Sequence, residues 1–281
     1  MQAWLNKTNI HLLNLYLLSL PQIEILPKKE TYRQKHLAKT GQHQSETKKE
    51  RIPINPALQQ TFLEGKTILI DKPLHWTSFD VVRKLRNLLQ IKKIGHAGTL
   101  DPLATGLLIV CTGKFTKKIN EYMAQQKEYT GHFTLGAVTP TYDLESNPEN
   151  PKDYSFVTEA LLHNTEKQFT GSIQQMPPVY SAIKKEGVAL YELARRGEEV
   201  ELKARSIVIY NFEITEINLP VVAFKVCCST GTYIRSLAHD FGQALGCGAY
   251  LSSLRRTAIG DLAVSNAETM ESFEASINPK P

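Results

Sequence analysis

The clearest helical pattern in the chain lies in residues 77–90, TSFDVVRKLRNLLQ. Thr77 and Asp80 are three residues apart, as in a capping box that closes the first turn of a helix. Shorter helical patterns occupy residues 114–125, 155–169, 188–197 and 231–246, and the last two end on Gly197 and Gly246, a residue type that favours the helix C-terminus. In residues 77–90, apolar residues recur every three or four positions, which predicts that one face of this helix is buried. That face carries Phe79, Val82, Leu85 and Leu89.

Strand-like patterns are more numerous than helical ones. Residues 66–73 and 106–113 are short apolar runs of the kind that forms buried strands. Residues 127–137, KEYTGHFTLGA, alternate between two faces, and two or three more strands fall within residues 199–217 and 221–229. The strands outnumber those expected from strict alternation with helices. This favours an α+β fold with a mixed, mostly antiparallel sheet and flanking helices and loops.

The first sixty residues differ in composition from the remainder. Residues 27–60 are polar, charged and poor in aromatic side chains, which is typical of a linker. Residues 1–26 contain an apolar stretch, but polar residues interrupt it and no small-residue cleavage site follows, unlike a signal peptide. We expect residues 1–60 to be an N-terminal extension, disordered or partly helical, and residues 61–281 to be the folded domain. No apolar run approaches the ~18 residues of a membrane helix, so no membrane association is expected.

The charge and the cysteines change this picture little. The first fifty residues carry +4 of the net charge of +5. The net positive charge is therefore weak support for nucleic-acid binding by the folded domain. Local basic pairs such as Lys92-Lys93 and Arg255-Arg256 are more typical of a solvated face unless several line one groove. The cysteines contain no CxxC pair, which argues against a zinc site and favours reduced thiols in the cytoplasm. They are Cys111, Cys227, Cys228 and Cys247.

The stretch GHAGTLDPLATG, residues 95–106, places one carboxylate in a loop of turn-forming residues. Asp101 precedes a proline, and aspartate is common in such turns because its side chain bonds nearby backbone groups. The alternative is a presented nucleophile, which must be accessible, rigidly held and ionised. A nucleophile in a cleft requires a cationic partner, and Arg235 at a predicted strand-to-helix junction is a candidate. A surface helix position is the competing interpretation of Arg235.

Two further side chains allow both a structural and a functional interpretation. Tyr129 is either half-buried core or a residue that stacks on a base or accepts a proton. His96 could act as a base, a metal ligand or a ring that stacks on a nucleotide, but no second ligand stands at metal-site spacing around it. Common cofactor motifs are missing from the sequence. Gly113-Lys114 does not have phosphate-loop spacing, and there is no GxGxxG, GxSxG or HExxH.

Several long motifs, taken in order, resemble the TruB family of tRNA pseudouridine synthases. They are ILIDKP, TSFDVV, GHAGTLDPLATGLL, KEYTGHFTLG, PPVYSAIKKEGVALYELARRG, GTYIRSLAHDFG and LGCGAYLSSLRR. The resemblance covers the chain from about residue 61 to the 260s. It implies the pseudouridine synthase fold and the isomerisation of uridine 55 in the T-loop of tRNA to pseudouridine. It also implies a flipped target base, the tRNA T-stem-loop as partner, and neither a metal nor another cofactor.

The resemblance also implies roles for individual residues. Asp101 matches the catalytic aspartate, which attacks either the base or the sugar, and Arg235 matches the arginine that pairs with it. Tyr129 matches the tyrosine that packs on the target base and helps to remove the carbon-5 proton. The remaining matches are substrate-binding positions: His96, Tyr233, Leu254 and Lys72.

Two departures from the family pattern shape the expectations. Many members carry a small C-terminal RNA-binding domain, for which residues 263–281 leave no room. Residues 1–60 lie outside the resemblance. We expect a cytoplasmic monomer with a single catalytic domain over residues 61–281. Three alternatives remain: a related synthase with another RNA substrate, a tRNA-binding protein that assists RNA folding, and a structural protein whose charged leader contacts RNA phosphates.

Overall fold

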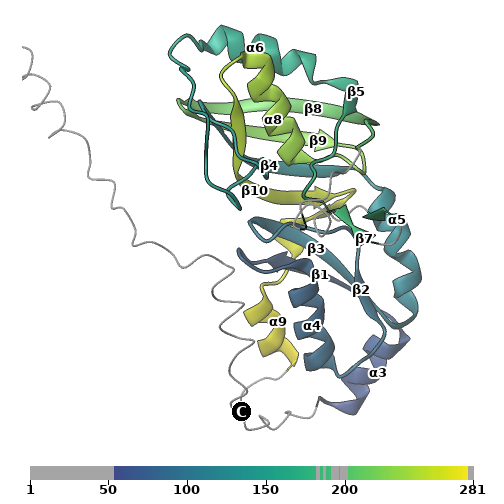
Figure 1. Ribbon diagram of the computed structural model, residues 1–281. Helices are drawn as coiled ribbons and strands as arrows, with labels where there is room; N and C mark the ends of the chain where they lie inside the picture. Colours follow the sequence, from purple (N-terminus) through teal and green to yellow (C-terminus); the bar gives the residue numbers. More distant parts are fainter. Residues whose placement is uncertain (1–53, 182–183, 186–187, 191–195, 197–201, 278–281) are drawn as a thin grey trace, which may run out of the picture. The chain divides into compact units, whose positions relative to one another are not determined.

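A single mixed β-sheet organises the folded part of the chain (Figure 1). The computed structural model describes residues 54–181, 184–185, 188–190, 196 and 202–277, and residues 53–281 form one compact unit. Within the described residues, nine strands belong to this sheet and helices pack on it, so the predicted α+β class is confirmed. None of the helices described in these ranges is long and apolar enough to cross a bilayer.

The strand order joins segments that are far apart in the sequence. The central path runs β1 (Thr67–Lys72), β3 (Ala104–Thr112), β10 (Ala249–Ile259), β4 (Lys127–Leu135), β9 (Val221–Cys228), β8 (Arg205–Asn218) and β5 (Gly171–Gln175). Off this path, β2 (Ile94–His96) pairs with β3 and β11 (Leu262–Ala263) with β10. Among these strands, β10 runs parallel to β3 and every other described pairing in the sheet is antiparallel. A separate pair consists of β6 (Lys184–Lys185) and β7 (Val188–Ala189).

The helices cover the sheet and bury separate apolar clusters. Helix α8 (Ile234–Leu245) packs on β10 and α6 (Glu159–Gln168) on β8, around an aromatic cluster that includes Phe133, Phe224 and Phe241. Helices α3, α4 and α9 enclose a second cluster with β1, in which Phe62 meets Phe273 edge to face. The helical elements are α3 (Pro56–Glu64), α4 (Ser78–Leu89), η1 (Gly113–Lys118), α5 (Ile119–Ala124), α6 (Glu159–Gln168), α8 (Ile234–Leu245), η2 (Val264–Asn266) and α9 (Met270–Ile277).

Helix α4 confirms the predicted capping box but not the whole predicted face. The Thr77 and Asp80 side chains each bond the other residue's backbone N–H, as the sequence indicated. Phe79, however, is 57% exposed, so its placement in the core was wrong. Since a helix turns 100° per residue, the face that starts at Ser78 continues at positions three and four further on, and Phe79 lies beside it. The buried residues of α4 are Ser78, Val81, Val82, Leu85 and Leu89.

Other element boundaries also differ from the predictions. The polar stretch up to residue 60 is not a linker at its end, because α3 begins at Pro56, capped by the Asn55 side chain, and buries Phe62. The helix predicted from residue 155 begins at Glu159 because Thr158 caps it. The stretch 114–125 starts as a 3₁₀ turn before α5. Of the predicted helix 188–197, the first two residues form β7 and residues 191–195 and 197 lie outside the described residues.

Gly106 allows β10 to lie against β3. Its φ of +101° is one that side chains rarely adopt, and a Cβ there would lie 2.3 Å from the carbonyl oxygen of Arg256. In the parallel ladder, Arg256 is the direct partner of Gly106. The glycine therefore permits the close backbone approach that brings the C-terminal strand between β3 and β4.

Gly106→Ala is expected to destabilise the domain by about 3 kcal/mol or more, because an unfavourable φ adds to a collision with backbone. Gly171→Ala is the matched control, since Gly171 has a φ of +99° and nothing within 4 Å of a Cβ. That variant should lose only about 1–2 kcal/mol from backbone strain. Urea unfolding of both variants measures the difference, and equal losses would show that the β3–β10 approach is not constrained at Gly106.

Candidate active site

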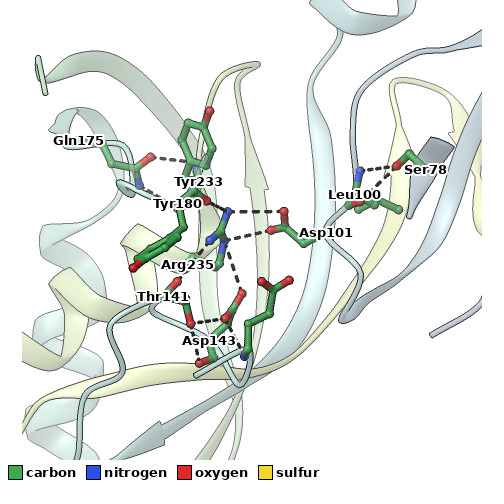
Figure 2. Close-up of polar contacts among 10 residues, drawn as sticks. Ser78, Leu100, Asp101, Thr141, Asp143, Gln175, Tyr180, Tyr233 and Arg235 are labelled. Atoms are coloured by element: carbon green, nitrogen blue, oxygen red, sulfur yellow. Dashed lines mark hydrogen bonds and ion pairs between the residues drawn. The ribbon is translucent and has the colours of Figure 1, made fainter. Parts of the chain in front are cut away.

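Asp101 lies in the loop between β2 and β3, and this loop is held close to the aspartate. The Ser78 hydroxyl at the start of α4 accepts a hydrogen bond from the Leu100 N–H at 2.8 Å and donates to the Leu100 carbonyl at 3.2 Å (Figure 2). The Asp101 carbonyl accepts from the Ala104 N–H at 3.0 Å. The Asp101 side chain remains 38% exposed. The loop thus presents an accessible carboxylate on a fixed backbone.

Lys72 fixes the other side of the same loop. Its side chain is fully buried at the end of β1, and Nζ donates to the carbonyls of Pro73 at 3.0 Å, Trp76 at 2.5 Å and Pro102 at 3.5 Å. Burial lowers the pKa of Lys72 to about 8, against an opposing effect of the Asp101 charge. His75 donates its backbone N–H to the Pro102 carbonyl at 2.8 Å. Lys72 therefore lies near Asp101 and bonds backbone carbonyls.

Arg235 pairs with Asp101 through two guanidinium nitrogens. Its Nε lies 3.0 Å from Asp101 Oδ2, and Nη2 donates to Asp101 Oδ1 at 3.5 Å (Figure 2). Arg235 is the second residue of α8, whose first turn follows β9 and faces the loop of Asp101. Its side chain is buried, so the guanidinium is a fixed charge beside the Asp101 carboxylate.

The partners that orient Arg235 were not predicted. Nη1 donates to the Thr141 carbonyl at 3.3 Å and Nη2 to the Tyr180 carbonyl at 3.0 Å. Nε also lies 3.7 Å from Oδ2 of Asp143, a buried carboxylate that accepts a hydrogen bond from the Thr141 hydroxyl at 2.6 Å. Burial raises the pKa of Asp143, and the Thr141 hydrogen bond and the Arg235 charge oppose that rise. One arginine thus lies between two carboxylates.

Asp143 carries one local signal in the sequence. Residues 139–146, TPTYDLES, are rich in turn-forming residue types, and Thr141 and Asp143 stand among them. Turn chemistry explains both residue types locally, because the Asp143 side chain also accepts the Glu145 N–H at 3.0 Å. The contact with Arg235 joins positions more than ninety residues apart and is invisible to local patterns.

Tyr129 and Tyr233 extend the site to strands β4 and β5. Tyr129 is 9% exposed, and burial raises the pKa of its phenol, with the Asp101 charge acting in the same direction. Tyr233 is half-buried before α8, and its backbone is clamped by Gln175 at the end of β5. The Tyr233 N–H donates to Gln175 Oε1 at 2.8 Å and Gln175 Nε2 donates to the Tyr233 carbonyl at 3.1 Å (Figure 2). Gln175 was not predicted.

His96 lies on β2, directly before the loop of Asp101, and Leu254 lies on β10, opposite the first residue of β3 after that loop. His96 ends β2 and is half-buried, and its Nδ1 is enclosed without a hydrogen-bond partner among the described residues. Burial lowers the pKa of His96, and the nearby Arg256 charge adds to that effect, so the ring is neutral at pH 7. Leu254 on β10 pairs with Ala104 of β3 and Gly131 of β4, and it packs against the aromatic cluster.

Together these residues form a carboxylate centre suited to nucleophilic chemistry. The charge of Asp101 acts on the pKa of Lys72, Tyr129, Asp143 and Tyr233. In the part of the chain that the structure describes, no group of three His, Cys, Asp or Glu side chains has a metal-site arrangement. An exposed carboxylate held by a buried arginine, with phenols beside it, can attack an electrophilic carbon and exchange protons there.

Two protein-family models match the chain. Residues 86–234 match the TruB family pseudouridylate synthase N-terminal domain, and residues 235–279 match the tRNA pseudouridylate synthase B C-terminal domain. The second range builds α8, β10, β11 and α9, which belong to the same compact unit as β4 and β9.

Curated relatives and solved structures agree with the family models. The tRNA pseudouridine synthase B of Flavobacterium johnsoniae is 56% identical over 225 residues, which cover 78% of this chain and 98% of the relative. The protein of the same name from Parabacteroides distasonis is 49% identical over 76% of this chain and 93% of its own length.

Among solved structures, a Cbf5-Nop10-Gar1 complex contains a chain of 30% identity with a TM-score of 0.60 over 80% of this chain. An H/ACA RNP bound to a substrate RNA containing 2′-deoxyuridine gives 28% identity and a TM-score of 0.58 over 80% of this chain. The match spans 60% of the length of each of those two solved chains.

Proposed function

This chain belongs to the TruB family of pseudouridylate synthases, and on that premise we propose that it isomerises uridine 55 in the T-loop of tRNA to pseudouridine. The observation that carries the proposal is the pair formed by Asp101 and Arg235, because a nucleophilic carboxylate must be both accessible and ionised. The names of the two curated relatives support tRNA as the substrate. Four free thiols support a reducing compartment, the cytoplasm.

The reaction exchanges a carbon–nitrogen bond for a carbon–carbon bond without changing the atoms of the nucleoside. Asp101 attacks the flipped nucleoside, at the sugar or at the base, and the bond between uracil N1 and ribose C1′ breaks. The uracil turns within the site and forms a bond from C5 to C1′. The C5 proton then leaves and N1 gains one, which completes pseudouridine. Arg235 orients the carboxylate for the first step and pairs with it again when the adduct breaks.

The other site residues have binding and proton-transfer roles in this proposal. Tyr129 packs on the target base and accepts the C5 proton, and Tyr233 lines the same pocket. Leu254 supplies an apolar wall between β3 and β4, and Lys72 secures the loop of Asp101. His96 contacts the RNA that surrounds the flipped base, since a neutral ring can stack on a nucleotide.

The test is release of tritium from a tRNA transcript labelled at carbon 5 of its uridines. Wild-type protein should release one label per tRNA, because C5 loses its hydrogen in each isomerisation. A transcript with cytidine at position 55 should release none. Release from other positions would replace uridine 55 with another substrate site. Tight binding of the T-stem-loop without any release would favour the binding-protein alternative.

A further inference from the structure

Arg256 on β10 is a buried cation that the site described so far does not use. Its side chain is 1% exposed, and none of the ion pairs among the described residues includes it. Nε donates to the Leu107 carbonyl at 2.8 Å and Nη2 to the Gly98 carbonyl at 3.1 Å. Burying a guanidinium without a carboxylate is costly, and two neutral carbonyls compensate only part of that cost. A role for the charge itself must therefore be sought.

The strand register places Arg256 between two parts of the active site. In the antiparallel ladder of β10 and β4, Arg256 lies directly opposite Tyr129, and facing side chains of such a pair are in contact range. Gly98, whose carbonyl Arg256 holds, stands three residues before Asp101 in the same loop. Arg256 thus stands across the ladder from Tyr129, and its guanidinium bonds the loop of the nucleophile.

The charges around the phenol act in opposite directions. Burial is the largest cause that raises the pKa of Tyr129, whereas the charge of Arg256 and a hydrogen bond from it lower that pKa. Cys228 and Asp101 raise it further. The charge of Arg256 also lowers the pKa of neighbouring cationic groups, namely Lys72, His96 and Lys127.

Resting on the proposed function, we propose that Arg256 is a positioning residue that ties the Asp101 loop to Tyr129 and supplies the positive charge beside which the phenolate accepts the C5 proton. In that step the C5–H bond breaks and its electron pair forms the C5–C6 double bond. The electrons of the C6–N1 double bond move to N1, which takes a proton from water. The C5 proton goes to the Tyr129 oxygen, so atoms and charge balance.

The first test measures single-turnover tritium release at saturating tRNA for Arg256→Gln. The rate constant should fall about 10-fold, because loss of the nearby charge disfavours the phenolate by about one pKa unit. The tRNA concentration for half-maximal rate should change by less than about 3-fold, since Arg256 is buried and acts through Tyr129. Arg256→Lys keeps the positive charge but loses the forked guanidinium. Its rate constant should therefore lie between those of wild type and Arg256→Gln.

A fluorinated tyrosine at position 129 separates this role from a structural one. Its phenol has a lower intrinsic pKa, so its insertion should restore much of the rate that Arg256→Gln loses. The pKa of the fluorinated phenol, read by absorbance, should rise by about one unit in Arg256→Gln and by less than half of that in Arg256→Lys. Arg255→Gln is the matched control and should not move this pKa, because Arg255 pairs with Asp71 at 2.6 Å and 3.0 Å.

An unchanged phenol pKa, or a rate loss that the fluorinated tyrosine does not reduce, would overturn the role of Arg256. If Arg256→Gln does not fold, Arg256→Lys decides: a phenol pKa raised by a full unit in that variant would also overturn it. If wild-type protein releases no tritium, the proposed function fails, but the phenol titration still measures whether Arg256 acts on Tyr129.

Discussion

Asp101→Asn is expected to reduce tritium release at least about 1,000-fold, because an amide of the same shape cannot form the adduct with the nucleoside. The change keeps the volume of the side chain and retains an oxygen that can accept a hydrogen bond from Arg235. The loop is held by Ser78, Lys72 and backbone groups and does not depend on the Asp101 carboxylate. The loss should therefore appear in the rate of a single turnover and not in tRNA affinity.

Asp71→Asn provides the matched control for this experiment. Asp71 is also a partly exposed aspartate paired with an arginine, since Arg255 bonds its two oxygens at 3.0 Å and 2.6 Å. It lies on β1, where its partly exposed side chain points to the face opposite that of the buried Lys72. Its replacement should leave the single-turnover rate within about 3-fold of wild type. Equal tritium release by wild type and Asp101→Asn would make Asp101 a turn residue.

Arg235→Met should lower the rate about 100- to 1,000-fold, because it removes the cation that lies between Asp101 and Asp143. Without it, two carboxylates face one another and one of them takes up a proton. A lysine at this position restores the charge but cannot make the forked contact with Asp101 and the two backbone carbonyls. Arg235→Lys should consequently recover only part of the rate.

A second substitution distinguishes charge from packing in this network. Asp143→Asn alone should lower the rate about 10-fold, since Arg235 still pairs with Asp101 but loses one of the partners that orient it. Adding Asp143→Asn to Arg235→Met removes the repulsion between the carboxylates, so the double variant should be faster than Arg235→Met. Losses that simply multiply would show that Asp143 and Arg235 act independently, contrary to the geometry.

Local signals in the sequence account for much of the fold. The capping box of α4, the alternation of β4 and the glycine that ends α8 each depend on neighbouring residues, and the structure confirms them. The ends of helices were less predictable where a short capping signal lies in a stretch whose overall composition is typical of a linker. The Asn55-Pro56 start of α3 lies within a polar stretch, and the exposed Phe79 shows that an apolar residue next to a buried face need not join it.

The site was predictable by residue type but not by its connections. Motif resemblance identified Asp101 and Arg235, and the structure brings them within 3.0 Å. The carbonyls of Thr141 and Tyr180 could not be found in this way, because a backbone oxygen carries no residue signature. Arg256 was visible only as half of a basic pair, which is usually exposed, and its burial follows from the strand register.

The place of β10 between β3 and β4 has a consequence for how the protein is made on the ribosome. Strands β3 and β4 are synthesised more than a hundred residues before the strand that separates them, so the nascent chain emerges with a gap in the middle of its sheet. Until β10 enters that gap, residues 104–106 of β3 and the edge of β4 that faces β10 lack their native partner and are open to wrong pairing. Assembly of the middle of the sheet is thus delayed until late in translation. A chaperone that shields the edges of β3 and β4 would act during that interval.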